Sequence, residues 1–256
     1  MYEHYSSDDP YETNLNALLS HLKNETPNAG FVAASKGEGQ NQTYGLALCR
    51  GDLASTDCGS CIAQAIHDMF EDCPYNKDVM IWHEDCTVGY SKEHNNSGIK
   101  IDDTMLCFKS QNDVEVPNPK VFIKKTQEFL SQITQKEELG SNNYASGEVK
   151  IDEYNMVYGY AQCNRDLSSK ECSDCLERSL DYAKECGRGK EGVRVYSGIC
   201  RLRYDMYPFL NDEYYYTPPI RDVKSPHPQP GDGSALEPGS IIGIGLVSLF
   251  IAHYVI

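Results

Sequence analysis

The sequence predicts an α+β fold of two tandem disulfide-rich domains, each with two helices packed on a small antiparallel sheet, followed by a proline-rich stalk and a hydrophobic C-terminal segment. Three observations predict it: one cysteine spacing that occurs twice, apolar stripes with helical periodicity, and short runs rich in β-branched and aromatic residues. The chain has 256 residues, enough for two domains of about 100 residues each.

The cysteine spacing defines the two domains. The second set of five cysteines repeats the first at an offset of 114 residues, apart from a shift of one residue at Cys186. The flanking segments 44–53 and 158–167 also align, beginning Tyr-Gly and ending Asp-Leu in both copies. We therefore expect domains over residues 1–105 and 106–212. The two sets are Cys49, Cys58, Cys61, Cys73 and Cys86, and then Cys163, Cys172, Cys175, Cys186 and Cys200.

Helices are predicted where leucine, isoleucine and phenylalanine recur every three or four residues. The first helix is expected over Tyr11–Asn24 and its counterpart over Pro119–Lys136. A second helix is expected over Ser60–Glu71, with a counterpart that begins near Asp174. Each domain then has two helices to cover one face of its sheet.

Strands are predicted where β-branched and aromatic residues are frequent. In the first copy these runs are Tyr44–Cys49 and Val79–Asp85. In the second copy they are Val157–Cys163 and Val193–Tyr204.

Composition narrows the class of function. A formal net charge of −15 repels phosphate backbones, so we expect no nucleic-acid partner. Eleven cysteines are many for a cytosolic chain of this length and indicate an oxidising compartment. Asn24, Asn41 and Asn95 each begin an Asn-x-Ser/Thr acceptor for N-glycosylation, which agrees with an extracellular location.

The Cys-x-x-Cys pairs, Cys58/Cys61 and Cys172/Cys175, allow three interpretations. A thiol at the start of a helix can be a redox centre, and two such pairs can hold zinc. In the third interpretation each cysteine forms a structural disulfide with a partner elsewhere in its domain. We favour the disulfides because the first two interpretations leave the other regularly spaced cysteines without a role.

The residues around these cysteines resemble a known family. The pattern Cys-x8-Cys-x2-Cys, a helix that ends in cysteine and a strand ending in Cys-x-x-x-Tyr is similar to the plant ginkbilobin-like domain, the salt-stress response/antifungal domain. The resemblance covers residues 5–212. Tandem copies of this domain form cysteine-rich repeat secretory proteins, plasmodesmata-located proteins and the ectodomains of cysteine-rich receptor-like kinases.

The resemblance implies a disulfide pairing. It pairs Cys49 with Cys58 and Cys61 with Cys86 in the first copy, and Cys163 with Cys172, Cys175 with Cys200 and Cys107 with Cys186 in the second. Cys73 is left unpaired. Its expected partner lies upstream of the first helix, and a secretory signal is missing from the same end of this chain.

The resemblance also suggests a carbohydrate site, because some members resemble mannose-binding lectins that use an Asn, an Arg and a Glu. The matching positions are Phe108, Arg194 and Asp205 in the second copy, with Met80 and Ser91 in the first. Only Arg194 keeps the residue type, and Asp205 is a shorter carboxylate. Because a sugar needs several fixed hydrogen bonds, we expect Arg194 to be a strand residue rather than a mannose ligand.

Catalytic motifs are missing. There is no Gly-x-Ser-x-Gly elbow, His-Glu-x-x-His motif, phosphate-binding loop or glycine-rich nucleotide fingerprint. His83 is expected on a solvent-facing strand edge beside two carboxylates. We therefore predict a protein that is not an enzyme and needs no cofactor and no metal.

The C-terminal region differs in composition. Residues 213–240 are rich in proline, glycine and serine and are expected to form an exposed linker. Residues 241–256 carry no Asp, Glu, Lys or Arg. They are shorter than a membrane span of about 20 residues, and we expect a truncated membrane segment or a lipid-anchor signal. The tyrosines at 214–216 could form a partner surface or pack against the first copy.

Together these features predict a recognition protein located outside the cell or at the plasma membrane. It resembles a cysteine-rich receptor-like kinase ectodomain without the kinase, with a role in stress or defence responses. The expected partner is another cell-surface receptor or a cell-wall component. The alternatives are a secreted antifungal protein that binds mannose or another carbohydrate, a plasmodesmata-located membrane protein, and an oxidoreductase.

Overall fold

The computed structural model describes residues 3–95, 98–99, 104–110, 116, 118–135, 139–187 and 189–211. The predicted stalk (213–240), the hydrophobic segment (241–256) and the tyrosines at 214–216 lie outside these residues. No helix in the part of the chain that the structure describes is long and apolar enough to cross a membrane.

The N-terminal domain places two helices on a four-stranded antiparallel sheet with strand order β1-β2-β4-β3. A short hairpin, β5 (His94–Asn95) and β6 (Gly98–Ile99), follows the sheet. The elements of the domain are α1 (Pro10–Ala29), β1 (Phe31–Lys36), η1 (Gly39–Asn41), β2 (Thr43–Cys49), α2 (Ser55–Asp72), β3 (Val79–Trp82) and β4 (Cys86–Ser91).

The C-terminal domain repeats this plan with a five-stranded antiparallel sheet of order β7-β10-β11-β9-β8. Its elements are β7 (Leu106–Lys109), α3 (Pro119–Ile133), β8 (Tyr144–Lys150), β9 (Met156–Cys163), α5 (Ser169–Gly187), β10 (Val193–Tyr196) and β11 (Cys200–Asp205). The predicted α+β fold of two tandem domains is confirmed.

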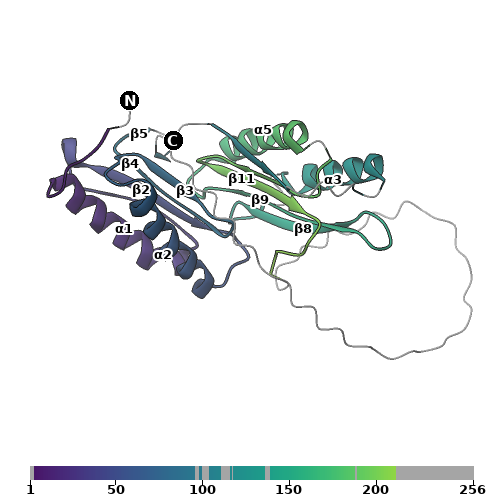
Figure 1. Cartoon of the computed structure of the whole chain (residues 1–256), viewed down its shortest axis with the longest axis horizontal. Helices are drawn as coiled ribbons and strands as arrows, with labels where there is room; N and C mark the ends of the chain where they lie inside the picture. The colour runs from purple at the N-terminus through teal and green to yellow at the C-terminus, as the bar shows by residue number, and fades with distance from the viewer. Residues whose placement is uncertain are drawn as a thin grey trace, which may run out of the picture.

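The two domains stack through their sheets. Each helix pair lies on the outer side of its own sheet, and the two sheets lie between the helix pairs (Figure 1). Each domain has its own apolar core between helices and sheet. A third, smaller cluster of Leu46, Met80, Trp82 and Tyr196 joins the sheets.

Local signals explain the ends of α1. The Asp9 side chain accepts a hydrogen bond from the backbone N–H of Tyr11, and Pro10 occupies the first turn, where its missing N–H removes no helical hydrogen bond. Gly30 ends the helix in the left-handed conformation, with φ of 74°. The helix is therefore longer than the predicted Tyr11–Asn24, because Pro27 is accommodated in its last turn and the chain turns only at Gly30.

Two predicted strands are shorter than expected. The run Val79–Asp85 is a strand only as far as Trp82, and the run Val193–Tyr204 is two strands joined by a turn at 197–199. The Ser197 hydroxyl oxygen accepts hydrogen bonds from the N–H groups of Ile199 and Cys200, which fixes this turn. The second helix begins at Ser55 rather than Ser60, and its counterpart at Ser169 rather than near Asp174.

Candidate functional site at the junction of the two sheets

Ten of the eleven cysteines form disulfides. Two bonds in each domain fasten the helix α2 or α5 to the central strands, and a fifth fastens α5 to β7. The pairs are Cys49–Cys58, Cys61–Cys86, Cys107–Cys186, Cys163–Cys172 and Cys175–Cys200, the same pairs that the resemblance implies. Cys73 is free and buried. Each cysteine of the two Cys-x-x-Cys pairs, which lie on α2 and α5, is thus bonded to a cysteine on a strand.

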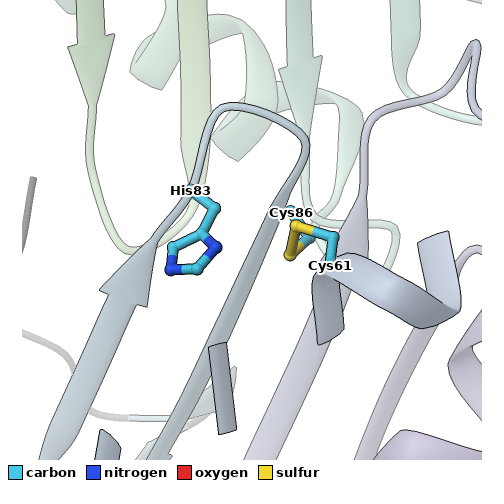
Figure 2. Close-up of side chains that lie close together, drawn as sticks. All are labelled: Cys61, His83 and Cys86. Atoms are coloured by element: carbon cyan, nitrogen blue, oxygen red, sulfur yellow. A yellow bond between two sulfur atoms is a disulfide. The ribbon is translucent and has the colours of Figure 1, made fainter. Parts of the chain in front are cut away.

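One cluster of potential metal ligands occurs in the part of the chain that the structure describes: Cys61, His83 and Cys86 (Figure 2). Both of its sulfur atoms belong to one disulfide, so neither can bind a metal as a thiolate while the bond exists. His83 lies in the turn between β3 and β4, and its Nε2 is 2.9 Å from an Asp68 carboxylate oxygen of α2. The expectation of a solvent-facing strand edge is therefore wrong, because β3 ends at Trp82 and the ring turns back to α2.

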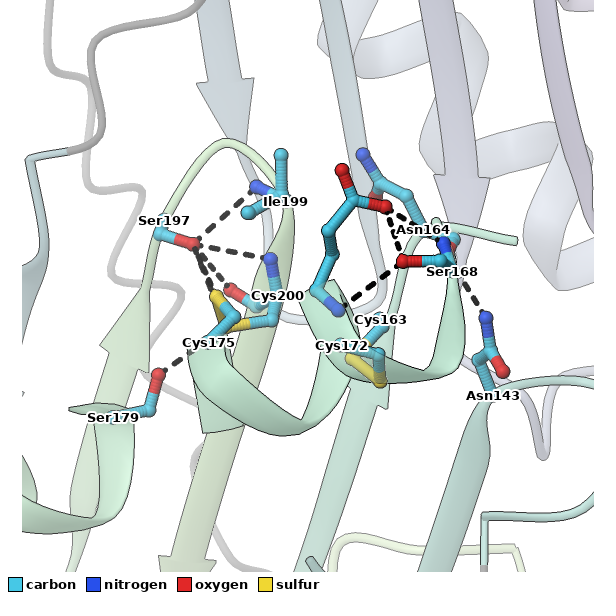
Figure 3. The surroundings of a disulfide bond; sticks show 11 residues. Asn143, Cys163, Asn164, Ser168, Cys172, Cys175, Ser179, Ser197, Ile199 and Cys200 are labelled. Atoms are coloured by element: carbon cyan, nitrogen blue, oxygen red, sulfur yellow. Dashed lines mark hydrogen bonds between the residues drawn. A yellow bond between two sulfur atoms is a disulfide. The ribbon is translucent and has the colours of Figure 1, made fainter. Parts of the chain in front are cut away.

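The equivalent disulfide of the C-terminal domain has hydroxyl neighbours instead (Figure 3). Ser197 stands 114 positions after His83 and donates a hydrogen bond to the Cys200 carbonyl at 3.1 Å. The Ser179 hydroxyl lies 3.3 Å from Cys200 Sγ. Because the two copies surround equivalent bonds with different side chains, we interpret both disulfides as structural supports rather than functional sites.

The face of the C-terminal sheet that meets the N-terminal domain is rich in arginine and tyrosine. Successive residues of a strand alternate between faces, and paired residues of neighbouring strands share one face. The register therefore places polar side chains from strands β8, β9, β10 and β11 on this face: Tyr144, Tyr160, Gln162, Arg194, Tyr196, Arg201 and Arg203. Arg201 and Arg203 are 1% and 0% exposed.

The opposing face of the N-terminal sheet is largely apolar, with Leu46, Met80 and Trp82 buried against Tyr196. Hydrogen bonds between side chains and backbone or hydroxyl groups cross the contact. The Trp82 indole N–H donates to the Ser197 carbonyl at 3.0 Å, and the Gln162 amide donates to the Cys49 carbonyl at 2.9 Å. The Arg201 guanidinium donates to the Thr87 hydroxyl at 3.2 Å. These bonds fix how the two sheets face each other.

The segment after β11 also crosses to the N-terminal domain. The backbone N–H of Asn211 donates to an Asp52 carboxylate oxygen at 2.9 Å, and the Asn211 side-chain amide donates to the Asp52 carbonyl at 2.8 Å. Arg50 donates to the Phe209 carbonyl at 3.1 Å. The end of the second domain is therefore held on the first.

At one edge of the junction a charged cluster reaches solvent. We call it the junction cluster and define it as Glu84, Arg194, Arg203, Asp205 and Tyr207. The Glu84 carboxylate, in the β3–β4 turn, lies 2.5 Å from Arg194 and 3.4 Å from Arg203. Arg194 also donates to the Tyr207 hydroxyl at 3.2 Å. Glu84 and Tyr207 are about half exposed, with exposures of 47% each, so a partner can reach them.

Asp205 is the buried acid of the junction cluster. Burial raises the pKa of its carboxyl group, and the charges of Arg203 and Arg194 offset only part of that shift. A Cβ at position 192 would lie 2.6 Å from Asp205 Oδ2, so the absence of a side chain at Gly192 lets the carboxylate lie against β10. The carboxylate accepts a hydrogen bond from the Met206 N–H at 3.0 Å.

The three positions that match the lectin residues come together here. Phe108 pairs with Arg194 across β7 and β10, and Arg194 pairs with Arg203, two residues before Asp205. The rings of Phe108 and Tyr196 lie 5.9 Å apart between centroids and are tilted by 48°. The Met80 and Ser91 positions of the first copy are both 2% exposed. The structure thus offers Arg194 and Asp205 at one edge, with Arg194 already paired to Glu84.

No motif in the sequence marks Glu84, Arg203 or Tyr207 as parts of a site. The alternation Arg201-Leu202-Arg203-Tyr204-Asp205 was the available signal, because it puts two arginines and an aspartate on one face of a strand. Their partner Glu84 comes from the other domain and could be found only from the packing of the sheets.

Comparison with known families gives the assignment. A family model described as salt stress response/antifungal matches residues 1–93 and 106–207. The chain belongs to this family. The two matched regions correspond to the two sheets and their helices, so the family's domain occurs twice here.

Relatives within the salt stress response/antifungal family include secreted and receptor-like proteins. The chain is 38% identical to an antimicrobial ginkbilobin-2-like protein of Castanea crenata, over 82% of this chain and 86% of that protein. It is 38% identical to cysteine-rich repeat secretory protein 38 of Arabidopsis thaliana, over 80% of this chain and 81% of that protein. It is 30% identical to cysteine-rich receptor-like protein kinase 25 of Arabidopsis thaliana, over 81% of this chain and 31% of that protein.

Among solved structures, the tandem DUF26 ectodomain of the Arabidopsis thaliana cysteine-rich receptor-like protein PDLP8 aligns with a TM-score of 0.69 and 27% identity. The alignment covers 80% of this chain and 95% of that ectodomain. The disulfides and these secretory and ectodomain relatives support an extracellular location for this family member.

The predicted glycosylation sites differ in their surroundings. Asn24 is exposed on α1, whereas Asn41 is half-buried at the end of η1. Asn95 lies in β5. Glycosylation at these sites stays a prediction.

Proposed function

We propose that the chain is a non-catalytic extracellular recognition protein of stress or defence signalling that binds another cell-surface receptor or a cell-wall component at the junction cluster. The observation that carries the proposal is the composition of this cluster. Glu84 comes from one domain, whereas Arg194, Arg203 and Tyr207 come from the other.

A surface built from both domains suits recognition for a physical reason. The buried contact between the sheets holds the cluster in one geometry, so a partner loses little free energy in ordering it. Arginine and tyrosine are also the residue types that contribute most to protein interfaces. The receptor-like and secretory relatives support a signalling or defence role.

Binding of the full chain to a panel of purified plant receptor ectodomains tests the proposal, measured by biolayer interferometry. For an ectodomain that binds, we expect Arg194→Ala to weaken affinity at least about 10-fold, since truncating a hot-spot arginine at the centre of an interface typically costs about 2 kcal/mol or more. Arg178→Ala is the matched control, because Arg178 is an exposed arginine on the distant helix α5. Equal weakening by the two variants would contradict the assignment to the junction cluster.

A second candidate is a secreted antifungal carbohydrate binder. Arg194 and Asp205 at one edge, together with the antimicrobial relative, support it. Its test is a mannan-binding assay and a fungal growth assay with the same two variants. Saturable mannan binding that Arg194→Ala abolishes would favour this candidate over receptor binding.

The proposal includes the domain organisation expected from the sequence. Residues 1–105 and 106–212 form the recognition body, 213–240 a linker, and 241–256 a truncated membrane segment or a lipid-anchor signal. A plasmodesmata-located membrane protein is an alternative with the same organisation. Expression of the full chain in plant cells, followed by detergent phase partitioning with and without a phosphatidylinositol-specific phospholipase, distinguishes the two kinds of anchor and a free secreted protein.

A further inference from the structure

A pocket lies between α3 and α5 of the C-terminal domain, on the side of the sheet away from the junction cluster. It holds about 100 Å³ of space. Its walls are mostly apolar, with Phe122, Leu130, Leu180, Ala183 and Tyr204 among the lining residues. The polar residues of the lining are Thr126, Gln127 and Lys184. Ile123 lies at the rim and is 36% exposed.

Comparison of the two repeats explains why the pocket exists. The buried residues of α1 and α3 correspond at a constant offset of 111 positions, which matches Leu15 to Thr126. The buried residues of α2 and α5 correspond at 114 positions, the offset of Cys58 to Cys172 and of Cys61 to Cys175, which matches Met69 to Ala183. Leu15 and Met69 are 0% and 1% exposed in the N-terminal core. Two large core side chains of the first domain are thus replaced by two small ones at the pocket.

The packing between the two helices also differs from one domain to the other. α1 and α2 contact each other closely, whereas α3 and α5 meet at few positions. A core normally leaves few voids larger than a water molecule, because lost contacts destabilise the fold. The two replacements leave a hollow between the helices that opens to solvent, and a small ligand filling it would restore the lost contacts.

The second observation is the hydroxyl of Thr126. Its side chain is buried, with an exposure of 3%, and its Oγ1 has no hydrogen-bond partner among the described residues. On the same helix the Thr134 hydroxyl donates to the Leu130 carbonyl at 2.9 Å, as a helical threonine commonly does. A buried polar atom without a partner is unfavourable, and a ligand with one hydrogen-bonding group would satisfy it.

From this geometry we propose that the pocket binds a small uncharged phenol, with its ring between α3 and α5 and its hydroxyl on Thr126 Oγ1. Size decides the class. A cavity of about 150 Å³ lined by aliphatic and aromatic residues accepts benzene, whereas drug-sized ligands need about 300 Å³ or more. A ligand with a single ring fits this volume, and one polar group on the ring can pair with the Thr126 hydroxyl.

The test uses the full chain, titrated with phenol and, in parallel, with benzene, while amide shifts of α3 and α5 are followed by NMR. We expect saturable shifts with both ligands. Thr126→Val keeps the shape and removes the hydroxyl, so it should weaken phenol by about 2- to 10-fold and leave benzene binding unchanged. Ala183→Met restores the side chain of the first domain and should abolish both.

Two controls make the outcome decisive. Thr134→Val removes a threonine hydroxyl of the same helix outside the pocket and should not change phenol affinity; a thermal melt of each variant verifies folding. Phenol binding that survives Ala183→Met, or no saturable shift with either ligand, would overturn the proposal. Two results with the ligand-free protein would also overturn the proposal. If the amide chemical shifts of α3 and α5 changed with protein concentration, a second copy would cover the pocket. If they changed on removal of residues 213–256, the chain itself would cover it.

Discussion

Arg203 illustrates how single side chains join the two domains. It is fully buried, lies 3.7 Å from the ring centroid of Phe209, and contacts the carboxylate of Glu84 from the other domain at 3.4 Å. Removing a guanidinium from water is unfavourable unless carboxylates and aromatic faces replace its hydration. Asp205, at 3.6 Å, is the second acid beside it. The two domains therefore depend on each other for the solvation of one charge.

The first prediction concerns Asp205 and pH. Because burial raises the pKa of Asp205 in the folded protein, the folded state binds this proton more tightly than the unfolded chain does, whose Asp pKa is about 3.9. The stability that this group contributes is thus present below about pH 4 and is lost as pH rises through the raised folded pKa. Asparagine cannot ionise. The change in the free energy of unfolding caused by Asp205→Asn should therefore be more favourable at pH 7 than at pH 3.5.

Urea unfolding of wild type and Asp205→Asn at both pH values measures this difference. The control is Asp181→Asn on α5, where the acid is exposed and pairs with the exposed Lys184. A loss of stability in Asp205→Asn that is larger at pH 7 than at pH 3.5 would contradict the prediction, because the ion pair with Arg203 would then outweigh burial.

The second prediction concerns Cys73. Its side chain is 2% exposed, and burial, with a smaller effect of the Asp72 charge, raises the pKa of its thiol. Since only the thiolate is nucleophilic, the thiol should react with iodoacetamide at pH 8 at least about 10-fold more slowly in the native protein than in urea. Mass spectrometry of the alkylated protein, without reductant, should find one modified cysteine after unfolding and essentially none before. Rapid native labelling would contradict the buried position.

At the scale of elements, helices were predicted more completely than strands. The leucines of α1 and the apolar residues of α3 recur with a period that only a helix uses, so burial followed the pattern. By contrast β1 (Phe31–Lys36) and β8 (Tyr144–Lys150) contain alanine, serine and glycine, and these small residues give little strand signal. Both strands lie at the edge of their sheet.

Disulfides act at this same scale, and the third prediction compares two of them. In the C-terminal domain Cys163–Cys172 spans 9 residues and Cys107–Cys186 spans 79. Restricting the unfolded chain stabilises more when the loop is longer, and the difference in loop length corresponds to roughly 2 kcal/mol. Replacing Cys107 and Cys186 together by alanine should therefore destabilise more than replacing Cys163 and Cys172 together.

The measurement is urea unfolding of the two double variants beside the wild type. Alanine in both pairs leaves no new polar group in the core, so the comparison isolates the cross-link. Equal losses of stability would show that packing around each bond, and not the length of its loop, sets its contribution.

At the scale of the whole molecule, the asymmetry of the two sheet faces is the feature that could not be predicted. The cysteine spacing indicates two equivalent domains, yet one sheet presents Leu46, Met80 and Trp82 while the other presents Arg201 and Arg203. A strand pattern shows which residues share a face, but not which second face will cover them. The junction cluster, which needs both domains, was therefore beyond the reach of the sequence.

The fourth prediction uses Trp82, the one tryptophan of the chain, as a reporter of this contact. Its indole is buried between the sheets and donates to the Ser197 carbonyl. In the wild type we expect urea to change tryptophan fluorescence and far-UV circular dichroism at the same midpoint, since the domains share a buried contact and should unfold together.

Met80→Ala removes a neighbour of Trp82 in the cluster that joins the sheets and should cost about 2–5 kcal/mol. Because each domain keeps its own core, the fluorescence midpoint should then fall below the circular dichroism midpoint. Val121→Ala, at an exposed position of α3, should leave both midpoints unchanged. If Met80→Ala moved the two midpoints equally, the sheets would separate only when the domains unfold, and the contact between them would have to be counted as part of a single core.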